Sequence, residues 1–235
     1  MISSTPAFAE LCGIHAGDGW ISSYNYEIGY GTATYEAPYF LYVMNLYQEC
    51  LPLKENIRIL WRRAIELRIQ SKECQQILQE AGFPRGSKLD HLRIPAFVWS
   101  KPEYLRRFLR GVMDTDGHVH WRKSVNRKYL VLTWTTASDA FASDIVRALH
   151  VLDLCAHEQT FIPRYKDRIR RRRVHCISIS RKSDVVFYLR HIGFKNPRRW
   201  EQVLRNKEEL LRYNTANLFK QTPEFSTLRA RSLAV

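Results

Sequence analysis

Two stretches of the chain end an apolar helical segment with an aspartate and a glycine. They cover residues 11–19 and 109–117, and both read Leu-x-Gly, four further residues, then Asp-Gly. The two aspartates are Asp18 and Asp116. A carboxylate at a helix C-terminus is unfavourable, because the helix dipole places partial negative charge there. One Asp-Gly turn ends many helices, but two in the same frame indicate a shared function.

Two carboxylates that meet at one place could hold a divalent metal ion. Hydrolysis of a phosphodiester needs an activated water and stabilisation of the charge on the phosphoryl group. Magnesium held by a few carboxylates and by the substrate phosphate supplies both. If the two helices are neighbours, Asp18 and Asp116 lie near one axis, and each could serve one strand of a DNA duplex.

Small residues indicate that the two helices pack tightly against each other. Gly13 and Gly17 lie four residues apart and so share one helix face. Gly111 and Thr115 repeat this spacing in the second copy. Residues without bulky side chains at such positions allow two helix backbones to approach closely.

The elements around the two motifs repeat in the same order. A capping hydroxyl followed by proline predicts a helix start near residue 3, and a capping box predicts one at residue 100. In each half the spacing of apolar residues then predicts two strands, a helix, two strands and a helix. The predicted ranges are 3–17, 20–24, 26–34, 37–50, 57–60, 65–69 and 73–81, then a helix from 100 into the second motif, 118–122, 129–136, 139–152, 160–165, 172–180 and 184–191, with a last helix over 201–212.

This order predicts an α+β fold of two pseudo-symmetric αββαββα halves. The first half covers residues 1–99, and the second covers residues 100–235 with a C-terminal helix and tail. The antiparallel sheets of the two halves would form a saddle, joined through the two central motif helices.

The paired motifs resemble the LAGLIDADG family of homing endonucleases in its single-chain, two-motif form. Gly19 and Gly117 occupy the last position of the family motif, and Asp18 and Asp116 occupy the acidic position before it. The resemblance covers the chain to about Arg205. It implies a monomeric, magnesium-dependent, site-specific DNA endonuclease. Such an enzyme cuts both strands of a long, asymmetric double-stranded target, leaves a staggered break and serves intron homing.

The same resemblance implies the remaining metal ligands. In the family the backbone carbonyl just before each acid also binds metal, which here means Gly17 and Thr115. Asp114 stands where the family motif has another acid, whereas Ala16 holds the equivalent place in the first copy. We therefore interpret Asp114 as a structural hydrogen-bond acceptor.

One lysine follows the last strand of each half and is predicted to be catalytic. Strand alternation places Lys72 on the side of Glu66, Arg68 and Gln70, and it places Lys182 with Ser178 and Ser180. The family has a basic residue at this location near its active site. The role of both lysines would be to stabilise charge or to orient water. The alternative is a solvated lysine at a helix start.

Basic and polar residues in or beside the predicted strands form the expected DNA-binding surface. A strand ribbon fits the major groove, where arginine pairs with guanine and glutamine or asparagine with adenine. The basic run 170–173 could instead be a solvated cluster, but it lies within a predicted hairpin. The predicted DNA contacts are Arg58, Arg62, Glu66, Arg68, Gln70, Arg122, Lys123, Arg127, Lys128, Arg164, Lys166, Arg170, Arg172, Ser178 and Ser180.

The composition agrees with a nucleic-acid-binding protein. The chain has 235 residues and a formal net charge of +14, which favours a polyanionic partner. No membrane span and no signal sequence are expected. The five cysteines are scattered, so neither a zinc site nor a disulfide framework is indicated, and a reducing intracellular compartment is expected.

Two other functions remain open on the same scaffold. One is an RNA-splicing maturase that binds intron RNA, a function that does not need the two acids. The other is a DNA-binding regulator that has lost cleavage. Both motif aspartates are present, which argues against loss of activity. Substrate preference separates the two, because a maturase would bind a folded intron RNA tightly.

Overall fold

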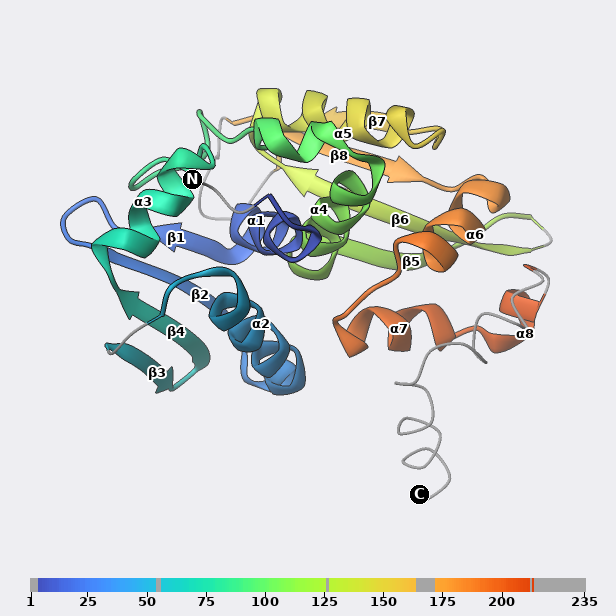
Figure 1. Ribbon diagram of the computed structural model, residues 1–235. Coiled ribbons are helices and arrows are strands. Elements are labelled where there is room, and N and C mark those ends of the chain that lie inside the picture. The colour runs from blue at the N-terminus through green and yellow to red at the C-terminus, as the bar shows by residue number, and fades with distance from the viewer. Residues whose placement is uncertain (1–3, 54–55, 126, 164–171, 212, 214–235) are drawn as a thin grey trace, which may run out of the picture.

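The computed structural model has an α+β fold of two similar halves (Figure 1). It describes residues 4–53, 56–125, 127–163, 172–211 and 213. Each half contains one four-stranded antiparallel sheet, with strand order β1-β2-β4-β3 in the first and β5-β6-β8-β7 in the second. No helix in these ranges is long and apolar enough to cross a membrane.

The first half follows the predicted order of elements closely. It contains α1 (Pro6–Asp18), β1 (Gly19–Ile21), β2 (Glu27–Ala33), a 3-10 turn η1 (Thr34–Glu36), α2 (Ala37–Cys50), β3 (Ile57–Trp61), β4 (Ala64–Gln70), α3 (Lys72–Glu80) and a second 3-10 turn η2 (Ala96–Ser100). The start of α1 is as predicted, because Thr5 is its N-cap and the Thr5 hydroxyl accepts a 3.1 Å hydrogen bond from the amide of Phe8.

The second half repeats this order and adds two C-terminal helices. It contains α4 (Pro102–Thr115), β5 (Gly117–Lys123), β6 (Lys128–Thr136), α5 (Asp139–Val151), β7 (His157–Phe161), β8 (Val174–Ile179), α6 (Lys182–His191), α7 (Pro197–Leu204) and α8 (Lys207–Leu211). The αββαββα order predicted for each half is therefore confirmed.

Two predictions about helix ends were wrong. The capping box at residue 100 does not form, because Lys101 is the N-cap of α4 and the Ser100 hydroxyl donates to the carbonyl of Phe97 at 2.6 Å. The single helix predicted over 201–212 is instead α7 and α8. Asn196 caps α7 with Pro197 in its first turn, a start signal earlier than the predicted one.

The helices α1 and α4 lie side by side between the two sheets (Figure 1). A methyl group at Gly13 would lie 2.1 Å from the carbonyl oxygen of Phe108, and one at Gly111 would lie 2.5 Å from that of Glu10. Both distances are far inside van der Waals contact. The predicted close packing of the two motif helices is thus confirmed, and it requires glycine at these two positions.

Alternation along the strands gives each sheet one buried and one open face. Ile65, Leu67 and Ile69 of β4 are buried, as are Ile177 and Ile179 of β8, whereas the residues between them are partly exposed. The helix α2 contacts β2 and β4, and α5 contacts β6 and β8. The predicted alternation of β4 and β8 is confirmed, and their partly exposed residues lie on the face of each sheet away from these helices, whereas the central strand β6 is buried over residues 130–134.

Candidate active site at the paired helix ends

The two motif aspartates come together where α1 and α4 end. Asp18 is the last residue of α1, and Asp116 follows the last residue of α4. A methyl group at Gly17 would lie 2.1 Å from the Thr115 hydroxyl and 3.4 Å from the carboxyl carbon of Asp116. The carboxyl group of the second motif therefore lies against the backbone of the first motif.

The surroundings of each carboxyl group in this pair disfavour its charged form. Burial raises the pKa of Asp18 to about 7, and the charge of Asp116 acts in the same direction, while Lys88 and Arg199 oppose the shift. Burial also raises the pKa of Asp116. The side chain of Asp116 is nevertheless exposed and that of Asp18 is partly exposed, so a cation can reach both carboxyl groups, and a bound cation favours their ionised forms.

A partly buried cation already lies at the end of the first motif helix. The ammonium of Lys88 donates to the carbonyl of His15 at 3.0 Å, to that of Gly19 at 2.8 Å, and also to that of Gly17. Burial lowers the pKa of Lys88 to about 8, although the carboxylates of Asp116 and Asp18 oppose this shift. Lys88 is therefore mostly charged at neutral pH, and it satisfies the helix-end carbonyls.

A second cation lies at the end of the second motif helix. The guanidinium of Arg199 is buried and donates to the carbonyl of Thr115 at 2.8 Å and to that of Asp114 at 3.3 Å. Lys88 and Arg199 thus perform the same task in the two halves. Each holds the carbonyl that precedes a motif aspartate.

The two cations occupy equivalent places in the repeated sequence. Lys88 stands five residues after Phe83, and Arg199 stands five residues after Phe194. Both phenylalanines follow a glycine that closes a helix with positive φ, Gly82 and Gly193. The sequence analysis missed both basic residues, although each follows a Gly-Phe pair at the same distance.

Asp114 agrees with its interpretation as a structural acceptor. Its side chain is buried, and Oδ2 accepts a 2.7 Å hydrogen bond from the amide of Lys195. Its carbonyl accepts a 3.0 Å hydrogen bond from the amide group of Asn196. Burial raises the pKa of Asp114 to about 8. Asp114 therefore ties α4 to the segment before α7.

The two lysines predicted to be catalytic lie at exposed helix starts. Lys72 opens α3 with its ammonium 5.8 Å from the centre of the Tyr26 ring, and Lys182 opens α6 with its ammonium 5.7 Å from the Tyr213 ring. Within the part of the chain that the structure describes, no hydrogen bond or ion pair joins either lysine to Asp18 or Asp116. Their catalytic role stays a prediction, with Lys88 and Arg199 as alternatives.

The donor atoms at the helix ends fit a hard divalent cation. They comprise the carboxylates of Asp18 and Asp116 and the carbonyl oxygens of Gly17 and Thr115, an all-oxygen set of the kind that magnesium takes. Among the described residues no three His, Cys, Asp or Glu side chains form a metal-binding group. Side chains alone therefore do not complete a coordination shell here.

The predicted contacts of the first sheet share its open face. Arg58 pairs with Arg68 in the register of β3 and β4, and Glu66 accepts a 2.8 Å hydrogen bond from Arg68. Gln70 ends β4 on the same face, and Arg62 lies in the exposed turn between the strands. The structure brings this predicted set together as one charged surface.

The predicted contacts of the second sheet divide between two faces. Arg122 and Ser178 lie on the open face, and exposed Ser180 follows β8. By contrast, Lys123 and Lys128 face each other on the side covered by helices, and the ammonium of Lys128 donates to Asn206 at 2.8 Å. The positions of Lys123 and Lys128 do not support their predicted DNA contacts, because a strand residue one place out of phase points to the opposite face.

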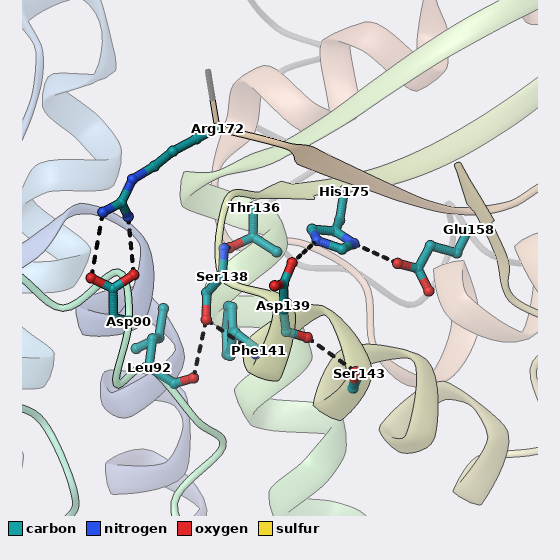
Figure 2. Close-up of polar contacts among 10 residues, drawn as sticks. All are labelled: Asp90, Leu92, Thr136, Ser138, Asp139, Phe141, Ser143, Glu158, Arg172 and His175. Atoms are coloured by element: carbon teal, nitrogen blue, oxygen red, sulfur yellow. Dashed lines mark hydrogen bonds and ion pairs between the residues drawn. The ribbon is translucent and has the colours of Figure 1, made fainter. Parts of the chain in front are cut away.

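The remaining basic residues lie in or near loops of the second half. Arg127 is exposed in the turn before β6, and Arg172 pairs with Asp90 at 3.0 Å (Figure 2). The predicted contacts Arg164, Lys166 and Arg170 lie outside the described residues. Two residues that the sequence analysis missed, His118 and His120, lie on the open face with their rings stacked 5.0 Å apart.

A buried histidine anchors the β7–β8 hairpin to α5. Nε2 of His175 lies 2.6 Å from a carboxylate oxygen of Asp139, at the start of α5, and Nδ1 lies 2.6 Å from one of Glu158 on β7 (Figure 2). Burial alone would lower the pKa of His175, but its hydrogen bonds to Glu158 and Asp139 outweigh burial and raise the pKa. Only the imidazolium form can donate to both carboxylates at once.

This anchor should make stability depend on pH. The pKa of His175 is raised in the folded state. The stabilisation that its charged form gives the fold is therefore complete at pH values below the ordinary histidine pKa of about 6.5, and it is lost as the pH rises through the raised pKa. We expect the unfolding midpoint of His175→Gln to lie below that of the wild type at low pH, with the gap narrowing as the pH rises. His157→Gln, an exposed histidine of the same hairpin, is the control. A gap independent of pH would contradict the charged anchor.

Comparison with known proteins identifies the architecture. Residues 103–193 match the model of the LAGLIDADG-like domain family. Three crystal structures are similar: the I-SmaMI LAGLIDADG homing endonuclease bound to cleaved DNA (12% identity, 96% of this chain and 95% of that chain, TM-score 0.55), I-GzeII in complex with its DNA target (10%, 97% and 97%, 0.55), and I-DmoI in complex with DNA and Mn (15%, 81% and 98%, 0.53). At these identities the likeness shows the fold alone. No curated protein matches the sequence.

Proposed function

We propose that this chain, which carries a LAGLIDADG-like domain and has the fold of single-chain LAGLIDADG homing endonucleases, is a site-specific endonuclease of double-stranded DNA. The observation that carries the proposal is the pair of carboxyl groups at the adjoining ends of α1 and α4. That pair lies between two antiparallel sheets, each with an open face. A duplex that lies across both faces would bring its two strands to the two acids.

The residues at the helix ends would hold and surround the scissile phosphates. Asp18, Asp116 and the carbonyls of Gly17 and Thr115 would bind a divalent metal. The I-DmoI structure with Mn gives support for such an ion. When bound, magnesium would supply an activated water and neutralise charge on the phosphoryl group.

The chain supplies fixed positive charge beside these acids. Lys88 and Arg199 hold the two carbonyls in place, and their own charges offset the negative charge that develops during phosphoryl transfer. Because each half contributes one acid and one cation, each half would cut one strand and leave a staggered break. Both halves lie in one chain, so the enzyme would act as a monomer.

The open faces of the sheets would read a long target. Arg58, Arg68 and Gln70 in the first half, and Arg122 and Ser178 in the second, would meet groove edges and phosphates, a role that their shared sheet faces support. The two sets differ in sequence, so the two half-sites need not match. Phosphate contacts should make the affinity fall steeply with salt.

A cleavage selection on a randomised duplex library with magnesium tests the proposal. We expect the wild type to enrich one long asymmetric target that is cut on both strands. A chain that enriches a target by binding but leaves it intact would instead be a cleavage-inactive DNA-binding protein. A chain that prefers a folded intron RNA to every duplex would be a maturase. Either of those two results would overturn the endonuclease proposal.

Replacing Lys88 should reduce cleavage far more than replacing Lys72. Lys88→Gln removes the charge beside the two acids and its bonds to three carbonyls, whereas Lys72 is exposed over the Tyr26 ring. Loss of one oriented charge in an active site costs about 10²–10³-fold in rate. Single-turnover cleavage of the selected target measures both variants. A larger loss of cleavage rate in Lys72→Gln than in Lys88→Gln would instead support the catalytic role predicted from the sequence for Lys72 and Lys182.

A further inference from the structure

A hollow lined by arginines lies at the other end of the helix pair from the catalytic acids. Its walls come from the first turns of α4 and the last turn of α6. Arg106 precedes Asp116 by ten residues, which is about 15 Å along a helix at about 1.5 Å per residue. A duplex on the open sheet faces would leave this hollow free. The lining residues are Glu103, Arg106, Arg107, Arg110, Arg190, His191 and Ile192.

A buried carboxylate behind the lining of the hollow orients two of its guanidinium groups. Glu10 of α1 is 1% exposed. Its carboxylate accepts from Arg107 at 3.2 Å and from Nε of Arg110 at 2.9 Å. Tyr42 donates to the same carboxylate at 2.7 Å. These bonds fix the directions of the two side chains, so little rotamer entropy remains to be lost when an anion binds.

Positive charge outweighs negative charge around this hollow. Four guanidinium groups line it. Arg107 and Arg110 are paired with Glu10 behind them. Asp114 also acts on Arg110, and Glu103 is the one acid among the lining residues that the structure describes. Arg107 keeps 38% of its side chain exposed, so it can bind Glu10 and still face a ligand. Planar guanidinium groups that converge on one hollow suit the oxygens of a phosphate, which they can bind with paired hydrogen bonds.

We propose that this hollow binds a phosphate group of a second, single-stranded nucleic-acid segment while the duplex target occupies the sheets. The inference builds on the proposed function but concerns a separate surface. A single strand can bend one phosphate into a recess, whereas duplex DNA stays stiff over about 150 base pairs. The net charge of +14 would help to hold both polyanions at once.

Fluorescence anisotropy on the full chain, saturated with its selected duplex, tests the site. The probes are a labelled oligouridylate and an oligodeoxythymidylate of the same length, with inorganic phosphate as competitor. We expect Arg106→Gln/Arg190→Gln to weaken probe binding at least tenfold and to leave duplex binding and cleavage unchanged. If that double variant does not fold, the single change Arg106→Gln serves, with a smaller expected loss. Preference for the oligouridylate would identify RNA as the ligand, and equal binding would identify the phosphodiester alone.

The control is a second double variant, Arg147→Gln/Arg205→Gln, which removes two exposed arginines elsewhere on the surface. Equal losses of probe affinity in the two double variants would contradict the proposed binding site, because they would show a general effect of net charge. Absence of probe binding to the duplex-loaded chain would also overturn it. If the chain proves not to bind or cut duplex DNA, the probes are applied to the free protein. A loss of probe affinity in Arg106→Gln/Arg190→Gln but not in the control variant would then support the binding site even though the proposed function fails.

Discussion

Gly13→Ala should destabilise the fold by about 3 kcal/mol or more, within a total stability that is typically about 5–15 kcal/mol. The new methyl group would lie 2.1 Å from the carbonyl oxygen of Phe108 and 2.9 Å from its carbonyl carbon. These are backbone atoms, so no side-chain rotation relieves the clash and the two helices must separate. Alanine gains about 0.5–1 kcal/mol over glycine within a helix, which is too little to offset this. Chemical denaturation measures the loss.

Gly31→Ala is the matched control for this experiment. A methyl group there would lie 3.6 Å from the side chains of Glu66 and Trp20, which is ordinary contact. Its unfolding free energy should stay within about 0.5 kcal/mol of the wild type, as is usual for surface substitutions. Gly111→Ala should resemble Gly13→Ala, because its methyl group would lie 2.5 Å from the Glu10 carbonyl. A mild effect in both helix variants would mean that α1 and α4 are more loosely packed than the structure shows.

The sequence predicted the helix pair and the faces of the strands because both leave a periodic trace. Gly13 and Gly111 hold the same place in two copies of one motif, and the apolar residues of β4 and β8 alternate with polar ones. Each of these features depends on neighbours at fixed spacing along one element. Such local rules are what a single sequence can reveal.

The cations of the site left no comparable trace. Lys88 lies in a segment without regular structure, and its partners are main-chain carbonyls about 70 residues away in the chain. Main-chain partners have no side-chain signature, so only the repeat of the Gly-Phe pairs could have indicated Lys88 and Arg199. The strand β7 begins at His157, whereas the sequence analysis predicted a strand over 160–165. The start was missed because all five residues of β7 are exposed. An edge strand without a buried face shows no alternation.

Asp18→Asn and Asp116→Asn should each reduce formation of doubly cut product by about 10³-fold or more. Each change removes one carboxylate from the proposed metal site, where charge stabilisation is worth several kcal/mol and every 1.36 kcal/mol is tenfold in rate. If each half cuts one strand, a supercoiled plasmid with the target should give mainly nicked circles with either variant. Gel analysis of this plasmid separates nicked from linear products. Asp90→Asn, which removes an exposed carboxylate paired with Arg172, should cut both strands at the wild-type rate.

In Asp18→Asn and Asp116→Asn, target affinity and stability should stay equal or rise while cleavage falls. The carboxyl groups lie at helix C-termini, where the dipole disfavours negative charge, and they repel each other. Asparagine removes that repulsion and also the repulsion between carboxylate and DNA phosphate. Target affinity without metal and the unfolding midpoint should therefore be equal to or higher than those of the wild type. A loss of cleavage accompanied by weaker binding and a lower midpoint would indicate that the aspartates support the fold, and it would remove the main support for a catalytic pair. A chain that gains stability as it loses cleavage keeps these two acids at a cost to its fold, which is the pattern expected of residues retained for chemistry.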